Sequence, residues 1–371
     1  MHDAKTSTQY ALLQPNSHWL SNLRMALRDG DRKPVCQMIC EFIFLCMKMR
    51  ELPVHYFTSF LYKKGQKNLM AHLGKKEMNL IQEIICDAGA VDILGNKLSF
   101  HQYYALHNIS LPHLLGYNIY ESGFSCKDGN WVRYDISDFD SGSEYLSFVL
   151  AESMNKSIFI KPITGSCGHS TKKIRISSHF SLQQMVDTLT FLSKGSFLIQ
   201  DEIIQHMDLG ILNDTSLNTI RMDTFKARGK RPEILSAFLR VGLSGSHIDN
   251  IQAGGIFVPI DIENGRLRAY GRNKLMKGAR TYSMHPDSEI LFSNFQLPFF
   301  ADVKQLALDA ASLMPQAMIG WDIAISNHGP VLIEGNARYY DMQLSDIAYG
   351  GYRNNPVFQK ALALANSVNK K

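Results

Sequence analysis

The pattern of apolar and polar positions changes near residue 96. Before this point apolar side chains recur every three to four positions, which predicts amphipathic helices. The clearest runs cover residues 19–27, 35–49 and 78–85. We therefore expect residues 1–95 to form a helical N-terminal region that packs on, or gates, the rest of the chain.

The run over residues 35–49 is the most apolar stretch of the sequence. It contains two charged residues and a glutamine, and it is shorter than the roughly 20 residues that a membrane-spanning helix needs. We predict a core helix of a soluble protein. Cys36 and Cys40 lie one helical turn apart on this run, so we expect two buried, reduced thiols.

After residue 96, short β-branched runs alternate with helical runs. Strands are expected over residues 157–161, 172–176, 196–200, 234–241, 256–260, 318–326 and 331–336. One helix should begin after the N-cap Ser181 and end at Lys194–Gly195, a second should cover 301–313, and a third should follow Asn355 and cover 357–367. Strands flanked by helices and joined by hairpins indicate an α+β (or α/β) fold with mixed sheets.

Composition and charge narrow the class of protein. The 371 residues are 45% hydrophobic and 20% charged, which predicts a large core divided over two or three lobes. The formal net charge of +5 permits an anionic substrate, and we expect no nucleic-acid partner. No two of the six cysteines have C-x-x-C spacing, and the opening residues are polar rather than signal-like. These features favour a cytoplasmic protein without a transmembrane segment.

A small-residue loop over residues 162–170 follows a strand that ends in Lys161. Glycines allow backbone N–H groups to approach phosphate oxygens, and the lysine adds a positive charge. The loop residues with this role are Gly165, Ser166 and Gly168. A strand pattern follows the loop, so we predict a hairpin flap over phosphates rather than a P-loop. The alternatives are a purely structural loop, or a nucleophile at Cys167 beside His169, for which no orienting third group is visible.

The strongest local signal is a pair of apolar strands over residues 319–336, each interrupted by an acid. Glu334 and Asn336 share one face of the second strand. Asp322 lies opposite Glu334 if the turn has three residues, with Gly329 in a left-handed position, or if a bulge compensates for a turn of another length. Carboxylate and amide oxygens suit Mg²⁺. The alternative is a polar edge hairpin whose acids face solvent.

Seven motifs in order resemble the ATP-grasp superfamily, and most closely its sugar-transfer-associated family. They lie at residues 96–98, 159–168, 197–206, 216–221, 238–242, 249–255 and 321–336. The resemblance implies an ATP-grasp fold in which two sheet lobes clasp ATP. The domain would cover residues 96–371, with a lid subdomain at about 150–208 and a catalytic subdomain at about 209–371.

The resemblance also implies roles for individual residues. Phosphates of ATP would be held by Lys97, Lys161 and the loop residues, and the adenine edge by Gln200, Asp201, Glu202 and Ile203, with Asp208 near the ribose. One or two Mg²⁺ ions would be held by Asp322, Glu334 and Asn336, Arg240 would face the transferring phosphoryl group, and Arg221 and Asn250 would lie on the substrate side. Two departures from the family pattern are Asn96, where an acid is usual, and the Cys167–His169 loop, which is usually richer in glycine.

Enzymes of this class activate a carboxylate as an acyl phosphate and then transfer it to an amine. The resemblance therefore implies a carboxylate–amine ligase, and the family name suggests a sugar-containing or natural-product acceptor, as in polysaccharide synthesis. Candidate acceptor residues are Asn250, Gly254, Gly255, Arg272, Lys274, Lys277, Arg280, Tyr339, Tyr340 and Gln343. The basic run among them could equally be a solvated loop, and the tyrosines could be packing residues.

Two other functions remain open from the sequence. The first is a kinase of the same fold that phosphorylates a small metabolite or sugar and forms no amide. The second is a non-catalytic nucleotide-binding scaffold in glycan biosynthesis. The set of acids, Lys161 and Arg240 argues against a silent scaffold.

Overall fold

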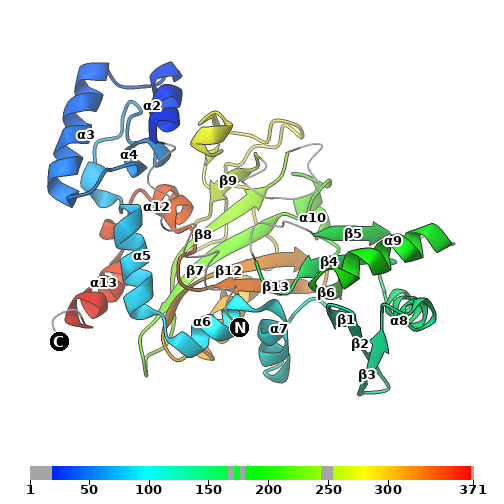
Figure 1. Cartoon of the computed structure of the whole chain (residues 1–371). Coiled ribbons are helices and arrows are strands. Elements are labelled where there is room, and N and C mark those ends of the chain that lie inside the picture. Colours follow the sequence, from blue (N-terminus) through cyan, green and yellow to red (C-terminus); the bar gives the residue numbers. More distant parts are fainter. Residues whose placement is uncertain (1–18, 166–170, 176–179, 244–253, 369–371) are drawn as a thin grey trace.

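Two antiparallel sheets form the framework of the computed structural model (Figure 1). The structure describes residues 19–165, 171–175, 180–243 and 254–368. All strand pairs in the described part are antiparallel, so the predicted α+β class is confirmed and the sheets are not mixed.

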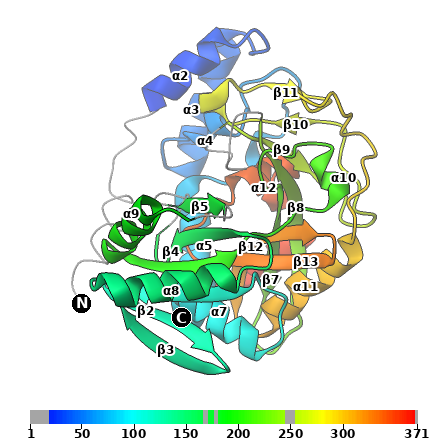
Figure 2. The same cartoon turned by 90° about the vertical axis from the view of Figure 1, so that its right-hand side faces the viewer.

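The six-stranded sheet has the order β3-β2-β1-β6-β4-β5. Its strands are β1 (Leu114–Ile119), β2 (Ser122–Lys127), β3 (Asn130–Asp135), β4 (Ser157–Pro162), β5 (Lys172–Arg175) and β6 (Ser196–Asp201). Helices α8 (Phe139–Ala151) and α9 (Leu182–Ser193) pack on this sheet, and together they enclose a separate apolar core (Figure 2). The predicted boundary at residue 150 falls inside α8, and the domain limits remain a prediction.

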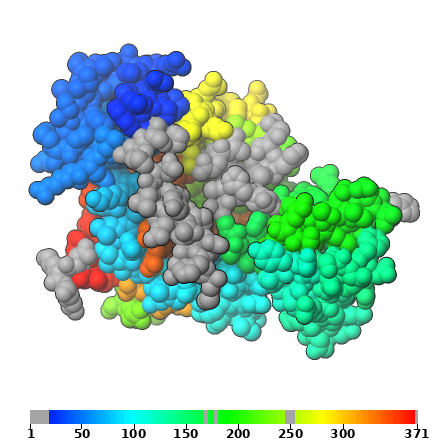
Figure 3. All heavy atoms as spheres, viewed as in Figure 1, coloured from blue at the N-terminus to red at the C-terminus, as the bar shows by residue number. Residues whose placement is uncertain are grey.

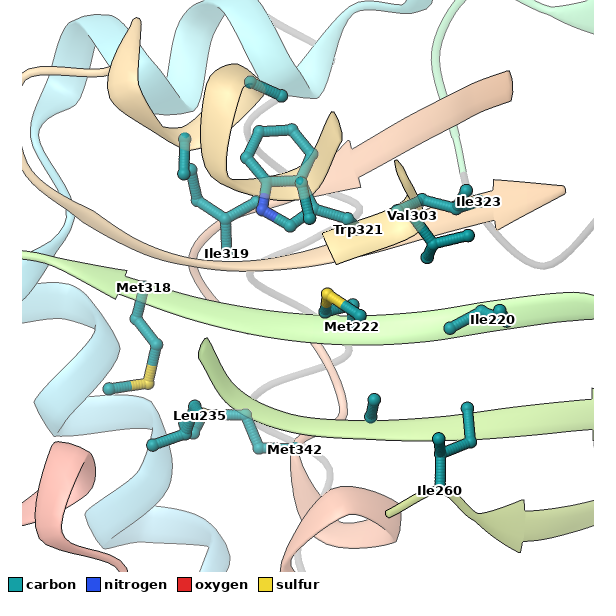
Figure 4. Close-up of a cluster of buried hydrophobic side chains, with 14 of the residues drawn as sticks. Ile220, Met222, Leu235, Ile260, Val303, Met318, Ile319, Trp321, Ile323 and Met342 are labelled. Atoms are coloured by element: carbon teal, nitrogen blue, oxygen red, sulfur yellow. The ribbon is translucent and has the colours of Figure 1, made fainter. Parts of the chain in front are cut away.

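The seven-stranded sheet has the order β11-β10-β9-β8-β7-β12-β13. Its strands are β7 (Thr219–Lys226), β8 (Glu233–Val241), β9 (Ile256–Pro259), β10 (Gly271–Arg272), β11 (Thr281–Tyr282), β12 (Ala317–Ser326) and β13 (Gly329–Asn336). Trp321 and Met222 lie on its apolar face with α11 (Phe300–Ser312) (Figure 4). The buried indole Nε1 of Trp321 donates to Thr224 Oγ1 at 2.8 Å. Side chains alternate along a strand, so Asp322 faces the other way.

The N-terminal helices divide between two cores. Helices α5 (Lys75–Ile85), α6 (Ala88–Gly95) and α7 (Lys97–Leu106) contribute to the core of the seven-stranded sheet, which α13 (Pro356–Val368) also joins. Helices α2 (Trp19–Arg28), α3 (Val35–Met49) and α4 (His55–Thr58) and the 3-10 turn Leu69–Ala71 form a second cluster. We call residues 19–73 the N-terminal lobe; it packs on β8, β9 and α12 (Gln343–Ala348).

The prediction that residues 35–49 form a helix is confirmed, but the prediction that this helix lies in the core is wrong. The segment is helical, but only Met38 and Leu45 of α3 are buried. Cys36 and Cys40, expected to be buried, are exposed. Apolar periodicity alone does not show which side of a nearly all-apolar helix is covered. Within the described ranges, the helices lack the combination of length and apolar character that crossing a bilayer requires.

The predicted caps are observed at two helices. Ser181 forms a capping box at the start of α9, and Asn355 Oδ1 accepts from the N–H groups of Val357 and Phe358 at the start of α13. Helix α9 ends as predicted, with Lys194 as its C-cap, and Gly195 does not adopt a left-handed conformation. A Cβ at this position would lie 3.0 Å from the Phe197 ring, so close packing accounts for the glycine.

Candidate active site

A cavity of about 1030 Å³ is lined by residues of both sheets, and it lies at the upper end of the size range of small-molecule sites. Figures 1 and 2 both place β4 beside the β12–β13 hairpin. The six-stranded sheet contributes Phe159, Lys161, Lys173, Arg175 and Gln200. The seven-stranded sheet contributes Thr219, Arg221, Phe238, Arg240, Asp322, Glu334 and Asn336.

The β12–β13 hairpin brings the two acids opposite each other. Its register pairs Ser326 with Gly329, so the turn has two residues, and of the two alternatives, a three-residue turn or a compensating bulge, the second is observed. Further along the ladder Ile323 pairs with Leu332, whereas Asp322 pairs with Glu334. The extra residue, Ile333, is a β-bulge that shifts the register by one. The expected pairing of Asp322 with Glu334 is therefore confirmed, through a bulge rather than through the turn.

Two arginines from neighbouring strands converge on Asp322. Arg221 on β7 donates from Nε to Oδ1 at 2.6 Å and from Nη2 to Oδ2 at 3.1 Å, and the Nη2 of Arg240 on β8 donates to Oδ1. All three side chains are largely buried. The two guanidinium groups of Arg221 and Arg240, which we call the arginine fork, face the cavity and can bind planar anionic groups.

Glu334 is a carboxylate surrounded by cations. Burial raises the pKa of Glu334, but four positive charges outweigh this effect and hold its pKa below the usual value. These charges belong to Lys97, Lys161, Arg221 and Arg240. In the described part of the chain Glu334 forms no direct ion pair, so its oxygens face the cavity with Asn336 Nδ2 at 3.4 Å from Oε1.

Lys161 and Lys97 reach the cavity from two different elements. Lys161 on β4 is buried, and this burial lowers its pKa to about 8, with Glu334 opposing the shift and Lys97 adding to it. Lys97 begins α7, and its Nζ donates to the carbonyl of Gly165 at 2.7 Å. The N-cap of α7 is Asn96, whose Oδ1 accepts from two backbone N–H groups. Asn96 stands where the family pattern has an acid, and its amide oxygen caps the helix as a carboxylate would.

The segment from Gln200 to Ile203 lines the cavity through residues at the end of β6. The Asp201 side chain is occupied elsewhere, because it accepts from Ser153 Oγ at 2.8 Å and from the Met154 N–H at 3.1 Å. The N–H groups of Asp201 and Glu202 are also engaged, because they donate to the carbonyls of His113 and Ser157 at 2.9 and 3.0 Å. Glu202 forms an ion pair with Lys173, which ties β5 to this segment.

The donors present fit a magnesium ion held in part by nucleotide phosphates. Glu334 and Asn336 supply free-facing oxygens, whereas both oxygens of Asp322 accept hydrogen bonds from arginines. Asp322 could bind a metal only by giving up one of these contacts. Across the ranges that the structure describes, no cluster of three or more His, Cys, Asp or Glu side chains is present, so a metal would need further ligands from phosphates and water.

Most of the predicted site residues line this one cavity. They are Lys97, Lys161, Gly165, Gln200, Asp201, Glu202, Ile203, Arg221, Arg240, Lys274, Asp322, Glu334, Asn336 and Tyr339. Ser166, Gly168 and Asn250, with Cys167 and His169, lie outside the described residues. Asp208, Gly254, Gly255 and Arg272 are not part of the lining.

The positions of these last residues have physical reasons. Asp208 is exposed on the short helix α10 (Met207–Gly210), where His206 Nδ1 accepts from its N–H. Gly254 and Gly255 are buried. The Arg272 guanidinium stacks 5.7 Å from the Phe60 ring centre in the N-terminal lobe. Lys277 and Arg280 are exposed, which agrees with the solvated-loop alternative for those two residues.

Several lining residues were missed from the sequence. Asp214, Thr215 and Ser216 belong to a polar turn before β7, which by composition resembles any loop. Lys173 and Arg175 flank the buried Ile174 on β5, so the period-two pattern could have placed both on the cavity side. Asp341, which pairs with Lys274 at 3.2 Å, lies beside the predicted tyrosines and had no motif of its own.

Comparison with known proteins gives the class and then the family. Two antiparallel sheets with a cavity of lysines, arginines and acids between them agree with an ATP-grasp fold. The family model described as sugar-transfer associated ATP-grasp matches residues 79–355, and the chain belongs to this family. No curated protein matches the sequence.

Solved structures with similarity to this chain are distant. L-amino acid ligase from Bacillus licheniformis has 10% identity and a TM-score of 0.38, over 68% of this chain and 43% of that one. D-alanyl-alanine synthetase A from Vibrio cholerae has 13% identity and a TM-score of 0.42, over 76% and 68%. VanG D-Ala:D-Ser ligase from Enterococcus faecalis has 11% and 0.43, over 76% and 64%. The chain spans less than half of the first of these proteins.

Proposed function

We propose that this protein is an ATP-dependent ligase that activates a carboxylate as an acyl phosphate and transfers it to an amine. The observation that carries the proposal is that Lys161 from one sheet and Glu334 from the other line the same cavity. A nucleotide phosphate chain with a divalent cation would complement both groups.

In this proposal ATP lies with its base against residues 200–203 and its phosphates toward Lys97 and Lys161. Mg²⁺, held by Glu334 and Asn336, would neutralise charge on the phosphates. Asp214 lines the cavity and is better placed for ribose hydroxyls than Asp208, which does not line it.

The arginine fork would stabilise the reacting groups. A substrate carboxylate oxygen attacks the γ-phosphorus, and ADP leaves with the electrons of the broken bond. The amine nitrogen then attacks the acyl carbon, loses a proton and displaces phosphate. Arg240 and Arg221 supply donors to the oxygens that gain charge in both steps, which is the main way proteins assist such transfers.

The acceptor end of the cavity would lie around Tyr339, Tyr340 and the Lys274–Asp341 pair. The Arg221 guanidinium lies 5.9 Å from the Tyr340 ring centre, which joins this group to the fork. The family description suggests a sugar-containing acceptor, and aromatic and ionic side chains suit one. Gln343 serves packing instead, because its Nε2 donates to Thr58 Oγ1 at 2.7 Å in the N-terminal lobe.

Hydroxylamine trapping tests the reaction. The protein is incubated with Mg-ATP, hydroxylamine and a panel of amino acids and sugar acids, and both ADP and hydroxamate are measured. A ligase gives both products with its own carboxylate. ADP with a phosphorylated hydroxyl compound and no hydroxamate would identify a kinase, and no ADP with any substrate, amine or sugar would favour a scaffold.

A further inference from the structure

Helix α3 exposes apolar side chains along its outer side. The row consists of Val35, Ile39, Ile43 and Met47, spaced four residues apart. Three of these side chains are exposed by more than half: Ile39 by 55%, Ile43 by 51% and Met47 by 69%. The opposite side of the helix packs on the N-terminal lobe through Met38 and Leu45. Such a row is large enough to require a covering surface.

The acid of α3, Glu41, is directed toward the rest of the N-terminal lobe. Glu41 accepts from Lys33 Nζ at 2.8 Å and from the Tyr56 hydroxyl at 2.7 Å. Successive helical residues are about 100° apart, so the exposed apolar side chains fill about half of the circumference. Besides the row, this arc contains Cys36, Cys40 and Phe44. The charge that lies at its edge is Lys48, with Nζ 6.0 Å from the Phe44 ring centre.

The exposed charges of the N-terminal lobe are almost all positive. The exposed cations of residues 19–73 are Arg24, Arg28, Lys48, Arg50, Lys64 and Lys67, against the single exposed acid Asp31. Figures 1 and 3 show this lobe at the end of the molecule remote from the six-stranded sheet, with α3 along its outer edge. A second copy would bring like charges together, whereas an anionic surface would complement them.

We propose that α3 docks the protein on an anionic phospholipid bilayer. The apolar row enters the boundary between headgroups and acyl chains, and cations of the lobe, Lys48 and the C-cap Arg50 of α3 among them, meet the lipid phosphates. This inference is independent of the proposed ligase activity, since none of its residues lines the cavity. It predicts an enzyme that works on the surface of a membrane.

Vesicle flotation with the full chain tests the proposal. We expect binding to vesicles of phosphatidylcholine with phosphatidylglycerol, weaker binding at high salt, and little binding to phosphatidylcholine alone. Ile39→Ser with Ile43→Ser should reduce the bound fraction by about tenfold. The matched control is Met154→Ser with Leu182→Ser, whose side chains are exposed by 73% and 69% outside the lobe, and its binding should not change.

A charge variant provides a second test of vesicle binding, which remains valid if the serine variant unfolds at a lower temperature. Lys48→Glu with Arg50→Glu leaves the apolar row intact and should weaken binding to the anionic vesicles several-fold. Binding that neither variant reduces would overturn the proposal. The proposal would also be overturned if the protein does not bind vesicles but sediments as a dimer, and the serine variant abolishes this dimer. A third contrary result would be vesicle binding that requires removal of residues 2–18.

Discussion

At the scale of single residues, the site depends on ionic groups that the fold holds in unusual surroundings. Lys161 is 7% exposed, and Glu334 lies among four cations. Asp322 is shared by two arginines instead of facing the cavity alone. The arrangement keeps opposite charges close but only partly paired, and added nucleotide phosphates and a cation would complete the pairing.

The first prediction concerns the pH dependence of ATP binding. The ammonium form of Lys161 binds phosphate, and its population falls as pH rises through the lowered pKa of about 8. The ATP affinity should therefore fall by up to about tenfold per pH unit above this value. The Lys161→Arg variant stays charged and should show a flat profile, as measured by titration calorimetry. The same slope in both proteins would contradict the role of Lys161.

Glu334→Gln should abolish turnover, with a loss of at least about 100-fold in ADP release. The pKa of Glu334 is lower in the folded protein than in the unfolded chain. The carboxylate therefore stabilises the fold at pH values above its pKa in the unfolded chain, and this stabilisation is lost as the pH falls through its pKa in the folded protein. At neutral pH the variant should remain folded and melt slightly lower. The exposed Glu263→Gln is the control. Full activity of Glu334→Gln would remove the metal assignment.

Arg240→Ala should lower the rate of phosphoryl transfer by about 100-fold or more and change ATP affinity only a few-fold. The fold should persist, because Asp322 keeps both hydrogen bonds from Arg221. Single-turnover rates and ATP titration measure the two quantities separately. Arg228→Ala, a surface arginine paired with Asp87, is the matched control. Equal losses of rate and affinity would assign Arg240 to nucleotide binding instead.

At the scale of elements, caps and bulges place the site residues. The strands β4, β5, β6, β8, β9, β12 and β13 were expected from the sequence, whereas β1, β2 and β3 were missed. The helix caps at Ser181 and Asn355 followed from residue type. The bulge at Ile333 could be given only as an alternative to a three-residue turn, because two adjacent apolar residues give the same pattern with or without a register shift. The bulge brings Asp322 opposite Glu334, so the geometry of the site depends on a feature that the sequence pattern does not reveal.

The cap of α7 gives a prediction at this scale. Asn96→Asp should preserve stability and ATP affinity, since a carboxylate caps equally well and complements the helix dipole. Asn96→Ala should cost about 1 kcal/mol in the free energy of unfolding and should weaken ATP binding by loosening Lys97. Urea denaturation and ATP titration check the two effects. Unchanged ATP affinity in the alanine variant would show that Lys97 is positioned without the cap.

At the scale of the whole molecule, the order of the motifs predicted the two-sheet fold, and the cavity between the sheets collects most of the predicted residues. The sequence did not reveal which apolar residues of α3 are covered, nor that Arg272 stacks on the N-terminal lobe. Both depend on how distant segments pack, which local periodicity does not encode. The polar turn at Asp214 was missed for the same reason.

The central claim is that the cavity between the sheets binds Mg-ATP. The most direct test is thermal unfolding of the wild-type protein and of Lys161→Met, with and without millimolar Mg-ATP. Ligand at 100 times its Kd stabilises a protein by about 2.7 kcal/mol, so the wild type should melt several degrees higher and the variant should gain much less. No rise in the wild type, or an equal rise in both proteins, would contradict the claim.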